Sequence, residues 1–223
     1  MTSTAQTKLA LVVRGGWDGH HPVAATDLFV PFLESEGFEV MIRDSTSAYA
    51  DADLMARVDL VVQCITMSTI EPDEVAGLRA AVEAGTGLAG WHGGIVDSFR
   101  ASSEYLHLTG AQFACHPSSS NRHTIEMLPA AADHPITRGI PDFELDTEQY
   151  WMLADSYIDV LAVTTQTASP GDPWQRPVTS PAVFTRQWGQ GKVFVATPGH
   201  DPEVLQNEHV NTLVKRGLLW AAR

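Results

Sequence analysis

Cysteine is scarce in this sequence of 223 residues, which contains Cys64 and Cys115 and no pair at CxxC spacing. Two separate cysteines exclude a Cys-rich zinc site and argue against a disulfide framework. We therefore expect both residues to be buried free thiols rather than catalytic groups.

Basic residues and long apolar runs are also few. The chain has 14 Lys and Arg residues against 27 Asp and Glu residues, which gives a formal net charge of −13. Such a charge repels a phosphate backbone, so we do not expect nucleic acid as a partner. The polar N-terminus and the short apolar run at residues 9–13 fit neither a signal peptide nor a membrane span, so we expect a cytoplasmic protein without a membrane partner.

Strand and helix patterns alternate in the first half of the chain. Hydrophobic residues make up 44% of the sequence without a break in composition, which indicates one domain over residues 1–223. Strands are predicted at residues 9–13, 38–42, 59–65 and 87–91, and helices at 22–36 and 71–84. This order is typical of βαβ crossovers, and it predicts an α/β fold with a mainly parallel sheet and helices on both faces.

The second half shows a different pattern, with short alternating segments after about residue 110. They lie at residues 123–128, 157–164, 182–187 and 192–196 and predict a mixed or antiparallel extension of the sheet. Residues 188–191 form a predicted turn and residues 169–181 an exposed loop. An amphipathic helix is expected to close the chain at 207–222.

The sharpest motif is Gly90-Trp91-His92-Gly93-Gly94, directly after the predicted strand at 87–91. Small residues on both sides of a central residue permit a tight strand-to-helix turn, which presents the central side chain at the carboxyl edge of the sheet. Hydrolases of this layout carry Ser or Cys there, whereas a histidine could act as a base, a metal ligand or, rarely, a nucleophile. The alternative is that the glycines only allow close helix packing and that His92 has no chemical role.

Other histidines follow predicted strands. His20 and His21 lie in the loop after the first strand, and His200 lies after the strand at 192–196. Loops at the carboxyl ends of parallel strands converge on one crevice, so His20 or His21 could join His92 and His200 in a site for a divalent metal such as Zn²⁺. Solvated loop histidines are the alternative.

Acidic residues alternate from Glu144 to Glu148, with Tyr150 in line with them. One interpretation is a solvated acidic edge. The other places Glu148 in the crevice as a general acid, a general base or a metal ligand. His116 could also line the pocket, although it cannot easily share a proton with Cys115, because neighbours on a strand point to opposite faces.

Asp201 has two interpretations, because Pro202 follows it. It could cap the closing helical region, with Pro202 at the first helical position, or it could contact a ligand.

Several motifs, taken in order, resemble the ThuA-like family, which is named for trehalose utilisation. They cover nearly the whole chain and lie at residues 87–94, 134–140, 148–150, 184–186, 189–194 and 198–200. The resemblance implies a three-layer, flavodoxin-like fold similar to that of class I glutamine amidotransferases, with His92 at the nucleophile elbow and His200 near the catalytic histidine. Because histidine stands where the thiol is required, it also implies no cysteine-dependent glutaminase activity.

The family's link to disaccharide catabolism implies a carbohydrate-processing protein whose partner is a small-molecule sugar. A disaccharide or a 3-keto-glycoside is the expected substrate, for a 3-keto-glycoside hydrolase or lyase or a sugar isomerase. His92, His200 and Glu148 are then the expected catalytic residues, by acid–base or metal-assisted chemistry. The residues expected to contact the sugar are Trp17, Asp18, Trp91, His116, Tyr150 and Asp201. The alternative is a non-catalytic sugar-binding or assembly protein, and a homo-oligomer is compatible with either function.

Overall fold

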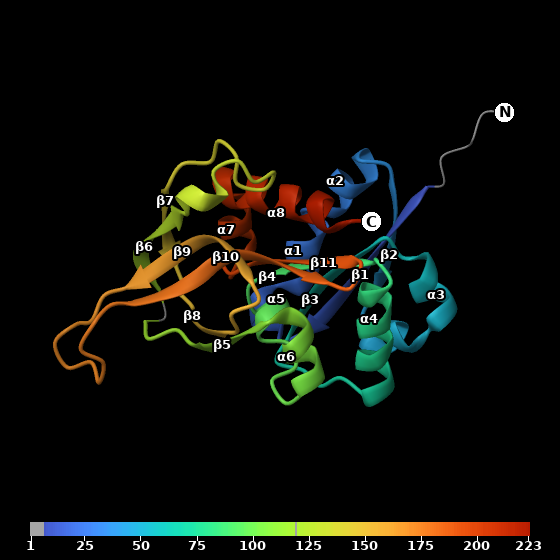
Figure 1. The fold of residues 1–223 in the computed structure, drawn as a ribbon, viewed down its shortest axis with the longest axis horizontal. Helices are drawn as coiled ribbons and strands as arrows, with labels where there is room; N and C mark the ends of the chain where they lie inside the picture. The colour runs from blue at the N-terminus through green and yellow to red at the C-terminus, as the bar shows by residue number, and fades with distance from the viewer. Residues whose placement is uncertain (1–6, 119) are drawn as a thin grey trace.

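A nine-stranded sheet dominates the computed structural model, which describes residues 7–118 and 120–223 (Figure 1). The strand order is β2-β1-β3-β4-β11-β10-β9-β6-β7. The parallel half consists of β1 (Lys8–Gly16), β2 (Phe38–Arg43), β3 (Leu60–Thr66), β4 (Gly87–Trp91) and β11 (Gly191–Ala196). The predicted strands at 9–13, 38–42, 59–65, 87–91 and 192–196 are thereby confirmed, and their carboxyl ends meet at one edge of the sheet.

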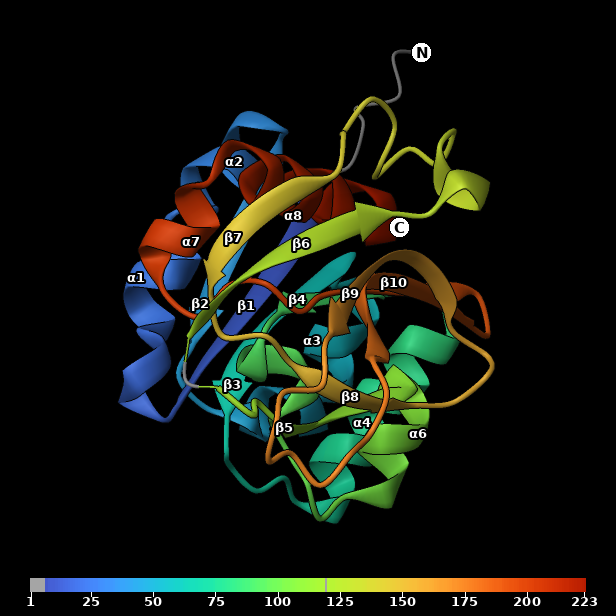
Figure 2. The same cartoon turned by 90° about the vertical axis from the view of Figure 1, so that its left-hand side faces the viewer.

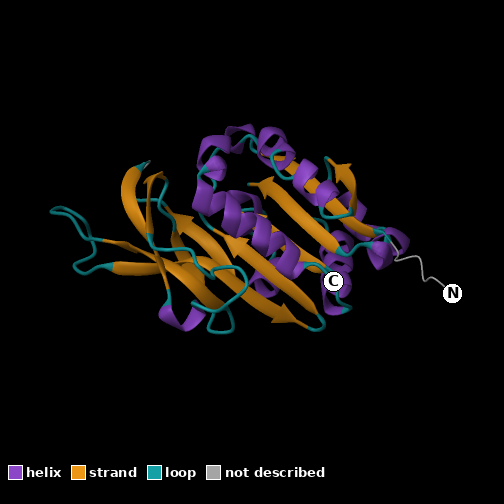
Figure 3. Cartoon of the chain, turned by 90° about the horizontal axis from the view of Figure 1, so that it is seen from above, coloured by secondary structure: helices purple, strands orange, loops and turns teal. Residues whose placement is uncertain are grey.

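The antiparallel half continues the same sheet through the hairpin between β10 and β11. It consists of β10 (Val178–Trp188), β9 (Asp159–Gln166), β6 (Asn121–Met127) and β7 (Phe143–Thr147). These strands extend to one side of the helical layers (Figure 3), and β7 lies against the C-terminal helical region, where the rings of Phe143 and His209 are 5.0 Å apart (Figure 2). Strands β5 (Ala111–Cys115) and β8 (Trp151–Ala154) pair in a small antiparallel sheet. The predicted antiparallel extension is therefore confirmed.

Helices cover both faces of the parallel half (Figure 1). One layer contains α1 (Pro22–Asp27), α2 (Val30–Ser35), α7 (Pro202–Gln206) and α8 (Glu208–Ala221). The other contains α3 (Ala52–Arg57), α4 (Pro72–Glu83), α5 (Gly93–Val96) and α6 (Ser103–Thr109). Short 3₁₀ turns, η1 (Asp18–His20), η2 (Thr46–Ala50) and η3 (Pro129–Ala131), join these elements. The chain thus has an α/β fold with helices on both faces of the sheet.

Strand β1 contributes side chains to two hydrophobic cores, one on each face of the sheet. Successive side chains of a strand point to opposite faces. Leu9, Leu11 and Val13 therefore enter the core under α3, α4 and α5, whereas Ala10 and Val12 enter the core under α1, α2 and α8. Burial on both faces accounts for the continuous apolar run in the sequence.

Two expectations need correction. The helix predicted over 22–36 is split into α1 and α2, because Pro31 lacks an N–H and its ring clashes with the carbonyl group four residues earlier. The exposed loop predicted at 169–181 ends earlier, since β10 begins at Val178. The first six residues of the polar N-terminus lie outside the described residues. Across the described part of the chain, no helix has both the length and the apolar character needed to cross a membrane.

Candidate active site

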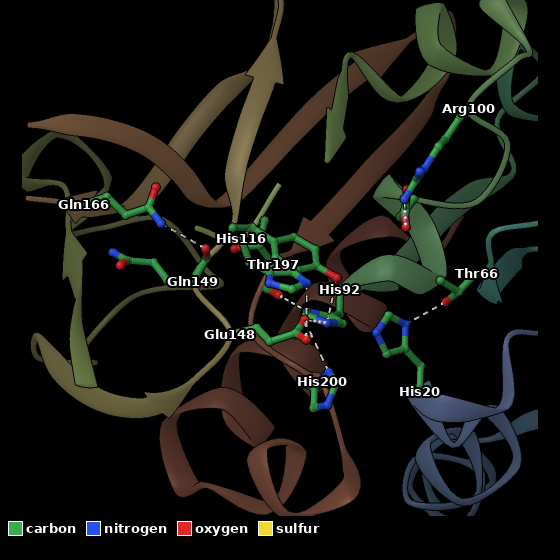
Figure 4. A network of polar contacts seen from close by, with 12 residues as sticks. His20, Thr66, His92, Arg100, His116, Glu148, Gln149, Gln166, Thr197 and His200 are labelled. Carbon is green, nitrogen blue, oxygen red and sulfur yellow. Dashed lines mark hydrogen bonds and ion pairs between the residues drawn. The ribbon is translucent and has the colours of Figure 1, made fainter. Parts of the chain in front are cut away.

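Four loops bring three histidines and one glutamate together at the carboxyl edge of the sheet (Figure 4). His20 comes from η1 after β1, His92 follows β4, His200 follows β11, and Glu148 lies between β7 and β8. One ligand atom from each residue lies within 4.8 Å of all the others. The predicted convergence of the three histidines is therefore observed, with Glu148 as the fourth member; we call this group the His–Glu cluster.

His92 sits on a strained turn between β4 and α5, with φ 50° and ψ −146°. A positive φ is unfavourable for a residue with a Cβ and costs of the order of 1–3 kcal/mol. The neighbouring glycines permit the turn, because a Cβ on Gly90 would lie 2.5 Å from the carbonyl oxygen of Gln63 and one on Gly93 would lie 2.6 Å from the His20 ring. Helix α5 therefore begins close to the sheet and holds His92 at its edge.

The hydrogen bonds of His92 define its tautomer. Nδ1 lies 2.8 Å from the carbonyl oxygen of Thr197, and because a carbonyl only accepts, Nδ1 carries the proton and donates. The Nε2 lone pair of the neutral ring is then free to accept the hydroxyl of Tyr150 at 2.7 Å. Burial lowers the pKa of His92, against the opposing effect of Glu148, so the neutral ring is favoured.

His20 is held in a similar way. Its Nδ1 lies 3.0 Å from Oγ1 of Thr66 at the end of β3, which leaves Nε2 unengaged by this contact. The ring centroid is 4.6 Å from that of His92 and 5.2 Å from that of His200. Burial, followed by the neighbouring His92 and His200, lowers the pKa of His20 to about 3. His20 is therefore a neutral imidazole near pH 7.

Glu148 supplies the negative charge of the cluster. Its Oε2 is 3.2 Å from Nε2 of His92 and 3.3 Å from Nδ1 of His200, and its Oε1 is 3.6 Å from Nε2 of His116. Burial alone would raise the pKa of Glu148, but the neighbouring histidines, His200 foremost, outweigh burial and hold the pKa well below its usual range. In turn, the carboxylate raises the pKa of His200.

One nitrogen of His200 faces Glu148. Nδ1 is enclosed and lies 3.3 Å from Oε2 of Glu148, without a well-directed hydrogen bond within the described residues. After loss of its proton this nitrogen could bind a cation held among the four side chains.

This donor set could hold a metal ion. Three imidazole nitrogens and one carboxylate oxygen suit Zn²⁺ and other divalent transition metals, whereas Ca²⁺ and Mg²⁺ prefer oxygen donors. Thr66 and the Thr197 carbonyl orient two of the rings, as outer partners of metal-binding histidines do. Sequence analysis missed both threonines, although their positions at or just after the ends of β3 and β11 were a usable signal.

Three of the predicted sugar contacts are not members of the cluster. Trp91 is 1% exposed, and its ring lies 4.9 Å from that of Phe29 in the core, so the prediction that it contacts a sugar is wrong. The Asp201 side chain accepts a hydrogen bond from the Val204 N–H at 2.9 Å, which confirms the capping interpretation. Asp18 is exposed at the start of η1.

Other predicted contacts lie next to the cluster. The Trp17 ring is 47% exposed and lies 4.8 Å from His20, at the rim. Tyr150 is buried and stacks on His92 with the ring centroids 4.1 Å apart. His116 approaches Glu148 from the more exposed side. His21 has a left-handed backbone, is exposed and is not a member of the cluster, so His20 fills the role that the sequence left open between them.

The cysteines are not part of this site. Cys64 is buried, as expected, and burial raises the pKa of its thiol to about 12. Cys115 is exposed, so the expectation of a buried thiol is wrong there; it occupies the end of β5, where the short sheet leaves its side chain uncovered.

Comparison with known proteins gives a consistent family and fold. The sequence profile of the family described as trehalose utilisation (ThuA) matches residues 9–221. A putative ThuA-like protein from Bacteroides uniformis has a similar structure, with a TM-score of 0.76, 18% identity and coverage of 99% of this chain and 94% of that chain. One from Parabacteroides merdae has a TM-score of 0.76, 16% identity and coverage of 97% and 90%. A cytoplasmic protein from Salmonella typhimurium has a TM-score of 0.67, 15% identity and coverage of 97% and 100%. No curated protein gives a significant sequence match.

Proposed function

Since this chain belongs to the trehalose utilisation (ThuA) family, which points to carbohydrate metabolism, we propose that it is a metal-dependent enzyme acting on a disaccharide or a 3-keto-glycoside. The single observation that carries the proposal is the His–Glu cluster, in which four ligand atoms lie within 4.8 Å of one another. His20, His92, His200 and Glu148 are the proposed ligands.

The preorganisation of the cluster supports a metal role. His20 and His92 are neutral at pH 7, as ligands must be, and hydrogen bonds to Thr66 and to the Thr197 carbonyl fix the orientation of the two rings. His200, whose pKa Glu148 raises, would release its proton when the metal binds. The backbone strain at His92 also fits a functional position. A structural histidine would not need the strained turn. When bound, a divalent metal would supply Lewis-acid polarisation of a substrate carbonyl.

The proposed reaction uses the acidity of the C–H bond next to a 3-keto group. A base removes the proton at C2, and the electrons of that bond form a C1–C2 double bond. The bond between C1 and the glycosidic oxygen then breaks, and the leaving sugar takes the electron pair and a proton. Addition of water to the unsaturated product completes a net hydrolysis, whereas release without water makes the protein a lyase.

Two side chains beside the cluster are suited to move these protons. His116 has a side chain that is 35% exposed, and its Nε2 lies 3.6 Å from Glu148, so it can face both substrate and solvent as the base. Burial, followed by the Glu148 charge, raises the pKa of Tyr150, so the phenol stays protonated and can donate. Acid–base catalysis by His92, His200 and Glu148 themselves is the metal-free version of the proposal.

The test combines metal analysis with turnover. Purified protein should contain about one transition metal per chain, should release glucose from a 3-keto-disaccharide, and should lose that activity on chelation and regain it with Zn²⁺ or Mn²⁺. His20→Asn should lower turnover by about a hundredfold or more. The neighbouring His21→Asn is the matched control and should leave turnover unchanged, because His21 lies outside the cluster and Asn tolerates its left-handed backbone.

The outcomes separate the alternatives. Full activity after complete removal of metal would favour the metal-free acid–base version. A protein that is stabilised by a disaccharide but turns over neither it nor its 3-keto form would instead be a sugar-binding or assembly protein.

A further inference from the structure

A cavity in the antiparallel half is lined by none of the four residues of the His–Glu cluster. It has a volume of about 510 Å³, within the range of about 300–1,000 Å³ typical of small-molecule sites. Asn121, Gln149, Gln166 and Trp174 are among its lining residues, together with Thr165, Thr167, Ser169 and Asp172. The side chain of Gln149 points away from His92, whereas Glu148 points toward it, and the Gln166 amide faces the main-chain carbonyl of Gln149 (Figure 4).

Side-chain amides build the wall of this cavity. Gln149 donates from Nε2 to Oγ1 of Thr164 at 2.6 Å and accepts at Oε1 from Nδ2 of Asn121 at 3.0 Å. Gln166 donates from Nε2 to the main-chain carbonyl of Gln149 at 3.3 Å. Because that carbonyl can only accept, the orientation of the Gln166 amide is fixed, and its Oε1 remains available to accept another hydrogen bond.

Three polar atoms of the lining residues have no hydrogen-bond partner in the described part of the chain. They are Oδ1 of Asn121, Oε1 of Gln166 and Nε1 of Trp174. Gln166 is only 8% exposed, and buried polar atoms are rarely left unpaired. Two acceptors and one donor are suited to hydroxyl groups, which both donate and accept. An apolar ligand would leave these atoms unsatisfied.

The charges around the cavity favour a neutral ligand. Arg122 is the cation of the lining, and its guanidinium is paired with Glu144. Glu126 and Asp172 add negative charge to the wall. A phosphate or carboxylate would therefore meet acidic side chains without a free arginine or lysine among the described lining residues.

We propose that this cavity binds a neutral sugar ring, through Asn121, Gln166 and the indole of Trp174. Planar amides and an aromatic side chain match the hydroxyl groups and the apolar face of a pyranose. Gln149 forms part of the wall, and the next residue toward the N-terminus is Glu148 of the His–Glu cluster. The cavity is thus a sugar site beside the active site. The choice of a sugar as ligand rests on the proposed function.

The test is to measure the binding of glucose and of trehalose to the full chain, by calorimetry and by tryptophan fluorescence. Trp174 should report binding, because its ring lies 5.3 Å from that of Trp151 near the cavity. Gln166→Met and Trp174→Phe should each weaken binding by about tenfold, as expected for the loss of a directed hydrogen bond. Gln187→Met is the matched control on β10, since Gln187 is exposed and bonds the Gly189 carbonyl outside the cavity.

Binding to a His92→Ala variant separates this inference from the proposed function. Sugar affinity should stay within about twofold of that of the unmodified chain, even though turnover is lost. Affinity that disappears in His92→Ala but survives in Gln166→Met would place the sugar at the His–Glu cluster and overturn the inference. No saturable binding of either sugar, or tenfold tighter binding of glucose 6-phosphate than of glucose, would also overturn it.

Discussion

The hydroxyl of Tyr150 lies 2.7 Å from Nε2 of His92, the same nitrogen that the His–Glu cluster would offer to a metal ion. In the arrangement observed here the phenol donates to that lone pair, since Nδ1 of His92 already donates to the Thr197 carbonyl. Metal binding therefore has to displace this hydrogen bond, which makes the Tyr150 hydroxyl available for another acceptor. The pair links metal occupancy to the position of a proton donor.

Tyr150→Phe should separate metal binding from catalysis. Removal of the competing hydroxyl should leave Zn²⁺ affinity unchanged or raise it up to about tenfold, because a typical hydrogen bond contributes about 0.5–1.5 kcal/mol. Turnover should fall by about a hundredfold if the phenol donates a proton. Competition with a chelating dye measures the first quantity and glucose release the second. A tenfold loss of Zn²⁺ affinity would instead identify Tyr150 as a support of the metal site.

His92 and His200 should behave as one unit. We expect His92→Ala and His200→Ala each to lower kcat/KM by at least about a hundredfold, and the double variant to be little worse than either. Steady-state kinetics on the three variants, with circular dichroism to check folding, measures the coupling. Effects that multiply in the double variant would mean that the two histidines act independently.

The stability of the metal-free protein should depend on pH in two opposite ways. Burial lowers the pKa of His20 from 6.5 to about 3, so the unfolded chain takes up its proton first and stability falls as pH drops below about 6.5. Glu148 raises the pKa of His200 above 6.5, so the stabilisation from charged His200 is complete below about 6.5 and is lost as pH rises through the raised value. The two histidines together predict greatest stability near pH 6.5.

Urea unfolding from pH 5 to pH 9 would measure this profile. His200→Asn should flatten the alkaline side, whereas His20→Asn should reduce, but not remove, the acid side, because burial also lowers the pKa of His92. Stability that keeps rising to pH 9 in the metal-free protein would contradict the assignment for His200.

Gly93→Ala should damage the metal site through His20. A Cβ at Gly93 would lie 2.6 Å from the His20 ring, so this ligand would have to move and Zn²⁺ affinity should fall by at least about tenfold. Gly94→Ala is the matched control in the same helix, because its Cβ would lie 2.8 Å from the Cα of Cys64, which is no ligand. Both substitutions should destabilise the fold by about 1–3 kcal/mol, so metal titration at equal folded fraction distinguishes them. Equal losses of affinity would show that only the turn matters.

The two cysteines should differ in reactivity without either being catalytic. Iodoacetamide should modify the exposed Cys115 in the folded protein, whereas Cys64 should react only on unfolding, because burial raises its pKa to about 12. Peptide mass mapping over time would follow both sites. No glutaminase activity is expected before or after alkylation, and an activity abolished by modification of Cys115 would refute this.

Sequence periodicity predicted much of the parallel half because its strands are buried on both faces. Both the continuous apolar run of β1 and the glycines around His92 reflect local requirements, burial on two faces and a tight turn, which can be recognised in the sequence. The break in the predicted helix before Pro31 could also have been predicted, since proline cannot continue a helix without losing a hydrogen bond.

The misjudged details depended on tertiary contacts. Glu144 and Glu148 alternate in the same acidic stretch, yet Glu144 lies exposed on β7 while Glu148 leaves the strand and meets the histidines. The orientation of Trp91 toward Phe29, and the choice of His20 over His21, similarly follow from which face of the chain packs on the sheet. The composition and spacing of the sequence do not specify which side chains turn toward the sheet and which turn toward the site.

The strand order of the sheet also has a consequence for biosynthesis. Strand β11 pairs with β4, although about a hundred residues separate them, and the loop after it brings His200 to the three cluster residues that precede it in the chain. A nascent chain that does not yet include β11 and the loop after it would therefore carry His20, His92 and Glu148 without His200. Such pairings of distant segments form late, because closing a long loop costs entropy before its contacts form. Capture of a metal ion by all four side chains would then have to wait until β11 has joined the sheet.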